Sequence, residues 1–244
     1  MSLKACFRLL MKAKCIAIIP ARGGSKRIPR KNIKDFFGKP LIAYSIEVAL
    51  ESKLFDKVIV STDDAEIADL AKNYGAEVPF IRPKSLSDDY TETVPVISHA
   101  IKWQIEHYQK PLYVCCIYAT APFIEKSDLQ SGLKILKSSG SNYVFPATNF
   151  AYPIQRSFRL KKNKEIEMFY PKNYNSRSQD LEEAFHDAGQ FYWGLADAWL
   201  ENKTIISDDA SPILIPRNRA MDIDTIEDWQ IAEKMFEAIN NKKK

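Results

Sequence analysis

Cysteine and long hydrophobic runs are both scarce in this sequence of 244 residues. The four cysteines are Cys6, Cys15, Cys115 and Cys116, and no two of them have the C-x-x-C spacing of a zinc or redox motif. A disulfide scaffold is therefore excluded, and we expect reduced structural thiols in a cytoplasmic protein. No apolar run reaches the roughly 18 residues that a membrane-spanning helix needs, so we expect no such segment.

A strong charge of one sign is also missing. The chain has 35 basic and 31 acidic side chains, a net charge of +4, which is too small to indicate a nucleic-acid partner by itself. With 45% hydrophobic and 27% charged residues, the composition is that of an ordinary folded protein and excludes intrinsic disorder and collagen. The length suits one large domain, or a domain with a small insert.

The first 140 residues alternate short apolar runs with helical patterns. The expected strands and helices are, in chain order, Cys15–Ile19, Leu41–Leu50 (helix), Lys57–Ser61, Ala65–Asn73 (helix), Glu77–Ile81, Val94–Tyr108 (helix), Leu112–Ile117 and Ser127–Lys137 (helix). Buried strands that alternate with helices indicate a mostly parallel sheet covered on both faces. We therefore predict a Rossmann-like, doubly wound α/β fold, in which ligands bind beyond the carboxyl ends of the strands.

This alternation is interrupted between about residues 148 and 190 by a polar, tyrosine-rich stretch. Phe150, Tyr152 and Phe158 lie in it and need burial, so we expect an inserted arm of hairpins that serves dimerisation rather than a disordered linker. The chain is accordingly predicted to form a homodimer.

Strands are expected again at Gln190–Leu195 and Ile213–Pro216, and a last helix at Ile226–Ile239. Residues 1–13 precede the first strand and are predicted to be an N-terminal extension, because their apolar run is short and interrupted by Arg8. The rest, 14–244, is predicted to be a single domain.

The segment ARGGSKRIPRKN, residues 21–32, directly follows the first expected strand. Six cations fall within the thirteen residues 22–34 with no acid among them: Arg22, Lys26, Arg27, Arg30, Lys31 and Lys34. Such cations repel one another unless an anion is present, and a loop at the end of a parallel strand is where a polyphosphate binds. The alternative is a solvated basic loop.

Two familiar nucleotide motifs are absent. The sequence has no G-x-G-x-x-G fingerprint and no G-x-x-x-x-G-K-[ST] loop. We expect side-chain cations and loop amides to hold the phosphates instead.

At this loop the sequence resembles the CMP-sugar synthetases, the cytidylyltransferases that activate sialic acid and related acidic ulosonic acids. Three later segments agree in order and spacing: STDD at 61–64, FIRPKSLSDD at 80–89 and MDIDT at 221–225. The resemblance extends over about residues 16–232. It implies a reaction in which the anomeric hydroxyl of the sugar attacks the α-phosphorus of CTP, giving a CMP-sugar and pyrophosphate.

The resemblance also implies a set of site residues. The catalytic residues would be Arg22, Lys31, Asp222 and Asp224, with Arg22 and Lys31 on phosphate. The nucleotide-binding residues would be Ala21, Arg22, Gly23, Ser25, Asn32, Arg82 and Ser87.

Asp222 and Asp224 form a D-x-D pair just before the last helix. In an extended segment, residues i and i+2 point to the same side. Two carboxylates together with triphosphate oxygens and water suit Mg²⁺, the expected cofactor. The alternative is a helix cap, because Thr225 and Asp228 have the spacing of a capping box. The pairs at 63–64 and 88–89 are expected to be turn or cap residues.

The sequence departs from the sialic acid type after the strand LYVCCI. Tyr118 stands where sialic acid enzymes carry a sugar-contacting glutamine. The segments YATAP (118–122) and FHDAGQFYW (185–193) resemble the pseudaminic acid branch, whose sugar is less hydroxylated and carries acylated amines. Aromatic side chains at Phe191, Tyr192 and Trp193 would suit that sugar, unless they belong to the core. The expected sugar-binding residues are Tyr118, Thr120, Arg177, Gln179, His186, Asp187 and Gln190.

The sequence thus predicts a cytidylyltransferase that uses CTP and an acidic nonulosonic sugar, with pseudaminic acid as the favoured substrate. N-acetylneuraminic or legionaminic acid is the alternative within the same class. A polyanion- or RNA-binding module is a remote alternative, and we expect no nucleic-acid partner, because aromatic platforms are missing beside the basic residues.

Overall fold

A computed structural model describes residues 15–241, so the predicted extension at 1–13 lies outside the described residues. The main sheet contains β1 (Cys15–Pro20), β4 (Lys57–Ser61), β5 (Tyr113–Ile117), β6 (Tyr143–Asn149), β9 (Phe185–Asp187), β10 (Phe191–Leu195) and β11 (Ala210–Leu214). The order across the sheet is β11-β6-β10-β5-β1-β4, and β9 pairs with β6. The pairs of β1 with β4 and β5 and of β11 with β6 are parallel, whereas β10 is antiparallel to both neighbours. This mostly parallel sheet confirms the predicted fold class.

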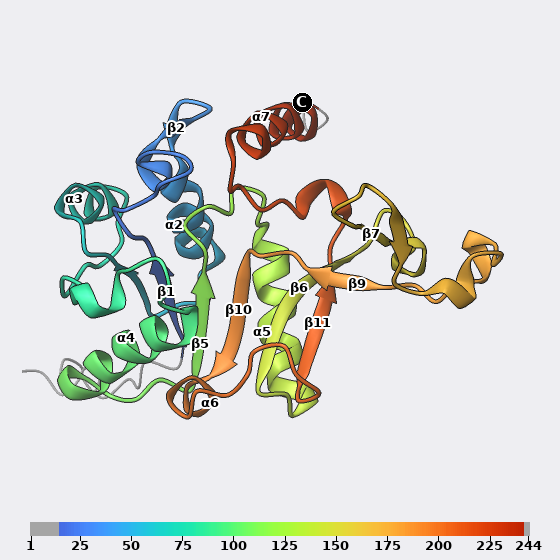
Figure 1. Ribbon diagram of the computed structural model, residues 1–244. Coiled ribbons are helices and arrows are strands. Elements are labelled where there is room, and N and C mark those ends of the chain that lie inside the picture. The colour runs from blue at the N-terminus through green and yellow to red at the C-terminus, as the bar shows by residue number, and fades with distance from the viewer. Residues whose placement is uncertain (1–14, 242–244) are drawn as a thin grey trace, which may run out of the picture.

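Helices cover both faces of the sheet (Figure 1). They are α2 (Leu41–Ser52), α3 (Ala65–Asn73), α4 (Thr93–His107), α5 (Lys126–Ser139) and α6 (Ala196–Leu200), and α7 (Ile226–Asn241) follows at the end of the described chain. The alternation of side chains along β1 divides the core, because Ala17 and Ile19 face one layer and Ile16 and Ile18 the other. Among residues 15–241, no helix combines the length and hydrophobicity that crossing a bilayer requires.

A third, smaller core lies under α7. Trp229 and Ala232 on one face of α7 pack with Phe36, which lies in the short hairpin of β2 (Asp35–Phe36) and β3 (Lys39–Pro40). Ile28 of the basic loop and Ile223 of the D-x-D segment are both buried in the same cluster, at 1% and 0% exposure. This core therefore holds together two segments that are almost 200 residues apart in the sequence.

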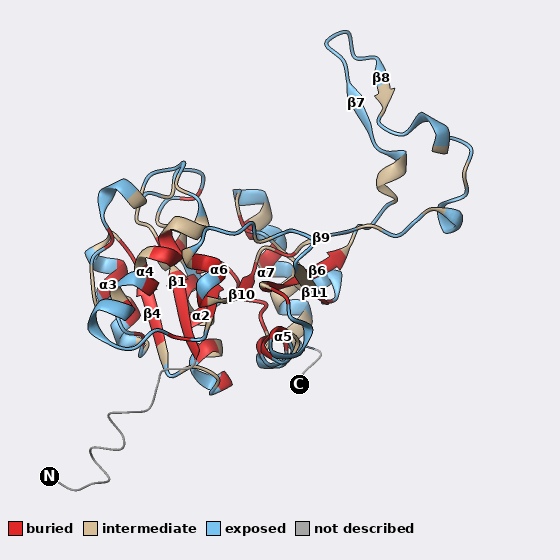
Figure 2. Ribbon diagram, turned by 90° about the horizontal axis from the view of Figure 1, so that it is seen from below, coloured by how far each residue is buried: buried red, intermediate tan, exposed pale blue. Residues whose placement is uncertain are grey.

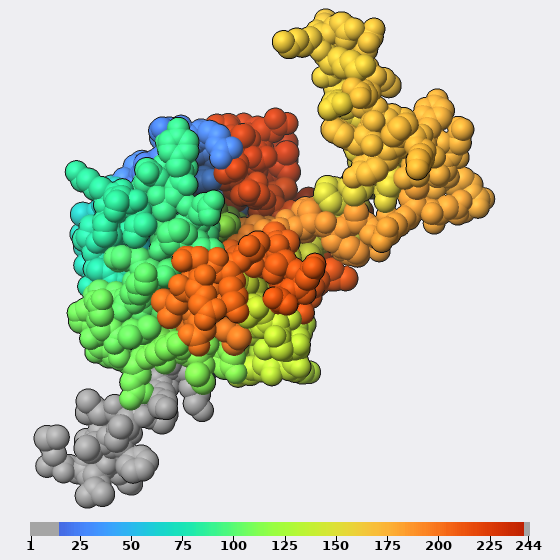
Figure 3. All heavy atoms as spheres, turned by 60° about the horizontal axis from the view of Figure 1, so that its bottom comes forward, coloured from blue at the N-terminus to red at the C-terminus, as the bar shows by residue number. Residues whose placement is uncertain are grey.

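The interruption of the α/β pattern is an arm that projects from the body (Figure 2 and Figure 3). It leaves the sheet after β6, contains the hairpin of β7 (Phe158–Leu160) and β8 (Ile166–Met168), and returns at β9. Its large apolar side chains are exposed rather than buried, with Tyr152 at 83% and Leu160 at 70%. The expectation that such residues need burial is not met within one chain.

Two local predictions were wrong. Glu77–Ile81 is not a strand, because only Glu77 and Ile81 make isolated bridges, to Ile59 and Thr62. The segment therefore touches the edge of β4 without pairing along it. Helix α5 begins at Lys126 rather than at Ser127, and its N-cap is Glu125, whose side chain forms a capping box with Asp128.

A half-buried ion pair fixes the segment before the D-x-D pair to the start of α5. The Arg219 guanidinium donates two hydrogen bonds to the Asp128 carboxylate, one of them at 3.1 Å. The two side chains are only 12% and 10% exposed. Such a bidentate pair restricts the orientation of both partners, so the Arg219 backbone is held close to α5.

Replacing Arg219 with methionine should lower the free energy of unfolding by about 3–5 kcal/mol, because it leaves the buried Asp128 carboxylate without its cation. The matched control is Arg177→Met, which removes an exposed arginine from its pair with Asp180 and should cost less than about 1 kcal/mol. Urea denaturation of both variants measures the difference. Equal losses of unfolding free energy in the two variants would show that burial does not determine how much the Arg219–Asp128 pair stabilises the fold.

Candidate active site

A cavity of about 590 Å³ lies beyond the carboxyl ends of β1 and β5, where the fold predicts a ligand. Pro20 at the end of β1 and Tyr118 just after β5 form part of its wall. The basic loop, the segment before α4 and the D-x-D pair form the rest. Four stretches from distant parts of the sequence therefore meet at this edge of the sheet.

The start of the basic loop packs tightly against the start of α3. A Cβ atom at Gly23 would come within 2.5 Å of Asp64 Oδ2, so no other residue fits there without displacing Asp64. The Gly23 amide donates a hydrogen bond of 3.0 Å to Asp63 Oδ1. Asp64 itself accepts from the amide of Ile67 and caps α3, in line with the expectation for this pair.

Two of the six cations are turned away from the cavity. Arg30 adopts a left-handed backbone conformation, with φ of 56°, and its guanidinium binds the carboxylates of Asp64 and Glu66. Hydrogen bonding from Arg30 holds the pKa of Asp64 below its ordinary value. Lys34 lies over the ring of Trp229, with Nζ 4.5 Å from the ring centroid. Both residues anchor the loop rather than line the cavity.

The other four cations line the cavity, and acids from elsewhere in the chain neutralise them. The Asp89 carboxylate bridges Arg22, at 2.7 Å, and Lys26. The Asp224 carboxylate bridges Arg27, at 2.9 Å, and Lys31, at 3.1 Å. The loop itself contains no acid, and these carboxylates reach its cations only through the fold.

The D-x-D pair is separate from the helix cap. The capping box at the start of α7 is made by Thr225 and Asp228, each of which accepts a hydrogen bond from the other's backbone amide. Asp222 and Asp224 both line the cavity instead. Burial, and next the nearby Asp224 carboxylate, raise the pKa of Asp222 above its ordinary value. Neither the Asp222 carboxylate nor the Asp224 carboxylate is therefore needed to cap α7.

The fit of a divalent cation depends on this pair. Within residues 15–241, no group of three or more His, Cys, Asp or Glu side chains is arranged to hold a metal ion. Two carboxylates alone suit Mg²⁺, which usually keeps several waters and takes further oxygens from substrate phosphates. The donor set therefore fits Mg²⁺ bound together with a polyphosphate and does not form a closed metal site.

The predicted nucleotide residues lie at or behind the cavity wall. Ser25, Asn32 and Arg82 line it. Asn32 is buried and donates to the Arg22 carbonyl, which fixes the loop. Arg82 is 4% exposed and donates through Nε to Ser87 Oγ at 3.1 Å, so Ser87 supports Arg82 from behind. Ala21 is buried and forms part of the core rather than the lining.

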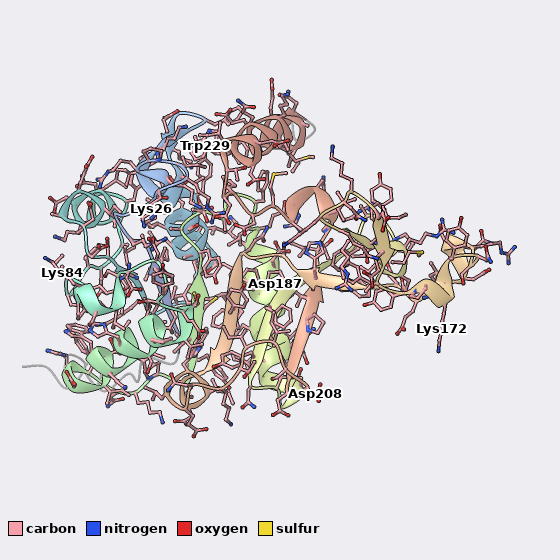
Figure 4. All side chains as sticks on the ribbon, in the orientation of Figure 1. Lys26, Lys84, Lys172, Asp187, Asp208 and Trp229 are labelled. Atoms are coloured by element: carbon pink, nitrogen blue, oxygen red, sulfur yellow. The ribbon has the colours of Figure 1, made fainter. Side chains whose placement is uncertain are left out.

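A second cavity of about 440 Å³ adjoins the first, since Tyr118 and Asp222 line both. His186, Asp187 and Tyr192 complete much of its wall. Figure 4 shows Asp187 beside the upper end of β10, at the same edge of the sheet as Lys26. Three of the predicted sugar residues, Tyr118, His186 and Asp187, therefore line a cavity that adjoins the one lined by the basic loop.

The remaining predicted sugar residues are distributed differently. Thr120 lines the first cavity. Gln190 is fully buried and donates to the Arg219 carbonyl, so it braces the wall from behind. Phe191 and Trp193 are core residues at 0% exposure, so the core alternative holds for these two aromatics, whereas Tyr192 lines the second cavity.

Arg177 and Gln179 lie on the arm, outside both cavities of their own chain. Arg177 forms an exposed pair with Asp180, at 2.7 Å. The arm carries them away from the sheet edge of their own chain, so their contact with the sugar stays a prediction.

The sequence analysis missed Asp89 and Thr93 as residues of the site. Both Asp88 and Asp89 line the cavity. The Asp88 carboxylate accepts from the amides of Tyr90 and Thr91, which makes it the turn residue expected there, whereas the Asp89 carboxylate pairs with Arg22 and Lys26. Thr93 lines the cavity and contacts the Tyr118 hydroxyl at 3.0 Å. A hydroxyl and a carboxylate in a polar loop carry no local signal for this, because only the fold shows which of them face inward.

The sequence profile of the cytidylyltransferase family matches residues 16–190. A pseudaminic acid cytidylyltransferase of Campylobacter jejuni is 51% identical over 225 residues, covering 91% of this chain and 96% of that protein. A CMP-N,N'-diacetyllegionaminic acid synthase of Legionella pneumophila is 33% identical over 232 residues, with 91% and 96% covered.

The fold has a counterpart among solved structures. A CMP:2-keto-3-deoxy-manno-octonic acid synthetase complexed with CTP matches with a TM-score of 0.66 and 16% identity, over 93% of this chain and 99% of that one. The match of the family profile to most of the chain, with half of the residues identical to one relative, establishes that the chain belongs to the cytidylyltransferase family of nucleotidyltransferases.

Proposed function

We propose that this protein transfers CMP from CTP to pseudaminic acid, giving the CMP-sugar and pyrophosphate. The observation that carries the proposal is the pairing of two cavities: four cations and a D-x-D pair line the first, and uncharged hydroxyls with Asp187 line much of the second. The 51% identity to the Campylobacter jejuni pseudaminic acid cytidylyltransferase supports the choice of sugar.

The triphosphate of CTP binds to the cations of the first cavity. Arg22 and Lys31 exchange their carboxylate partners for oxygens of the triphosphate, which carries more negative charge than a single carboxylate. Arg27 and Lys26 add further positive charge to the site. Arg82 and Asn32 are fixed by their own hydrogen bonds and keep the wall of the nucleotide site rigid. This arrangement neutralises the phosphates and holds them in one orientation.

Mg²⁺ is the proposed cofactor, held by Asp222 and Asp224. When bound, it supplies positive charge to the triphosphate oxygens. Asp224 is positioned for this role because its carboxylate faces the cavity and already contacts two cations of the phosphate site, Lys31 and Arg27.

The sugar binds in the second cavity, next to the first. Its anomeric oxygen forms a bond to the α-phosphorus, the bond from that phosphorus to the pyrophosphate oxygen breaks, and the hydroxyl proton leaves. Tyr118 and Asp222 lie on the boundary between the cavities, so they face the region where the two substrates meet. Holding both reactants there turns a bimolecular reaction into an effectively unimolecular one.

We also propose a homodimer formed through the arm. Exposed Tyr152, Leu160 and Tyr174 give the arm an apolar surface that a second copy would bury. Within a dimer, Arg177 and Gln179 of one arm become candidates for the partner's sugar site. The cytoplasm is the proposed compartment, because it keeps thiols such as those of buried Cys115 and Cys116 reduced.

The metal is tested by Asp224→Asn, which should reduce turnover by on the order of 10²-fold because it removes a charged ligand beside the reacting phosphates. EDTA should abolish activity and excess Mg²⁺ restore it. Asp208→Asn, a change of an exposed acid at the opposite edge of the sheet (Figure 4), is the control and should match the wild type. Full activity of an Asp222→Ala/Asp224→Ala protein would refute the metal site.

The phosphate site is tested by Lys31→Ala. The loss of one charge-assisted contact, worth about 1.5–3 kcal/mol, should weaken CTP binding by roughly 10- to 100-fold. Titration calorimetry with CTP measures it, and Lys134→Ala on the exposed side of α5 is the control. If the Lys31→Ala variant binds CTP with unchanged affinity, the triphosphate binds elsewhere.

Substrate choice is tested by kcat/KM for pseudaminic and N-acetylneuraminic acid with CTP and Mg²⁺. We expect a preference for pseudaminic acid of up to about 10²-fold, because an aromatic wall rejects an added hydroxyl only weakly. Legionaminic acid belongs in the same panel, since a relative is named for a legionaminic acid derivative. Equal or better use of N-acetylneuraminic acid would overturn the sugar assignment and leave the cytidylyltransferase activity standing.

A further inference from the structure

Three hydroxyl-bearing side chains lie in the wall between the two cavities. Thr93, at the start of α4, lines the first cavity, and its Oγ1 lies 3.0 Å from the Tyr118 hydroxyl. The rings of Tyr118 and Tyr192 meet edge to face with centroids 5.4 Å apart. The Tyr192 hydroxyl in turn donates to Asp187 Oδ2 in the second cavity.

The direction of the hydrogen bond between Tyr192 and Asp187 is clear. A carboxylate oxygen accepts, so the Tyr192 hydroxyl donates its proton to Asp187 Oδ2. Burial raises the pKa of Tyr118 to about 12 and that of Tyr192 further, so both phenols stay protonated and keep donating.

Asp187 is held from two sides. Its Oδ1 accepts from the amide of Gly189, at 2.9 Å, in a turn where Gly189 has a φ of +63°. Its Oδ2 accepts from Tyr192, whose ring is buried at 4% exposure on β10. One contact comes from the local turn and the other from the core of the sheet, so together they fix the carboxylate relative to β10.

From these contacts we infer that Tyr192 is a positioning residue, which holds the Asp187 carboxylate in place to accept a hydrogen bond from an uncharged hydroxyl or amide N–H of the sugar. The inference rests on the proposed function. A fixed negative charge there repels the sugar's own carboxylate. The sugar therefore binds with its carboxylate directed away from Asp187. In this way Asp187, held by Tyr192, sets the orientation of the sugar.

The test is Tyr192→Phe, which removes one hydroxyl and keeps the ring. It should raise KM for the sugar about tenfold, the loss expected for a hydrogen bond to a charged group, and leave KM for CTP within about twofold. The control is Tyr143→Phe, which removes a hydroxyl from another buried tyrosine of the same sheet, one that donates to the Lys203 carbonyl. It should change neither KM, because Tyr143 lines neither cavity.

A double-mutant cycle separates positioning from a general effect on packing. In an Asp187→Ala background, Tyr192→Phe should cause no further rise in the sugar's KM, because the group that it positions is gone. A tenfold rise that persists in that background, or an equal rise of both KM values in Tyr192→Phe, would overturn the inference. So would an unchanged sugar KM in a Tyr192→Phe protein that melts at the wild-type temperature.

The test of Tyr192 does not depend on which of the acidic sugars the protein converts. Pyrophosphate release is measured with pseudaminic acid and, in parallel, with N-acetylneuraminic and legionaminic acid. A wild-type protein that converts only one of the other two would overturn the proposed substrate. The same variants, compared on the acid that is converted, would still decide whether Tyr192 acts through Asp187.

Discussion

The parallel pairing of β1 with β4 on one side and β5 on the other is the constraint on which the site depends. It brings the ends of three buried strands to one edge, and each is followed by a polar segment: the basic loop, the Asp63–Asp64 cap, or Tyr118 and its neighbours. Backbone groups in and beside these segments form hydrogen bonds that join one segment to the next. The hydrogen bonds from Gly23 to Asp63 and from Arg82 to Thr62 are examples.

The small core under α7 also positions charged residues of the site. Trp229 packs with Ile28 and Ile223. Ile28 directly follows Arg27, and Ile223 lies between Asp222 and Asp224, and these three charged residues line the cavity. The hydrophobic side chains thus set the distance between Lys31 and Asp224, which would otherwise depend on two flexible loops. A long final helix, which carries no cavity residue itself, in this way controls the geometry of the charged groups.

Much of the fold could be predicted because its signals are local. Helix α3 has the predicted bounds, Ala65–Asn73, since an acidic N-cap and apolar spacing mark it in the sequence. Non-local features could not be predicted. Nothing near Arg30 in the sequence shows that it turns to Asp64, and a run of aromatics does not reveal that Phe191 and Trp193 alternate into one core layer while Tyr192 reaches the cavity.

The carboxylates of Asp89 and Asp224 pair with the cations of the proposed phosphate site. A nucleotide that binds there exchanges one set of anions for another and does not meet bare positive charge. The protein therefore exerts a weaker long-range pull on polyanions than its basic loop alone would exert. Added salt screens the attraction between exposed charges, and here less attraction is available to be screened. The affinity for a nucleotide should therefore fall less steeply with salt concentration than the number of cations in the loop implies.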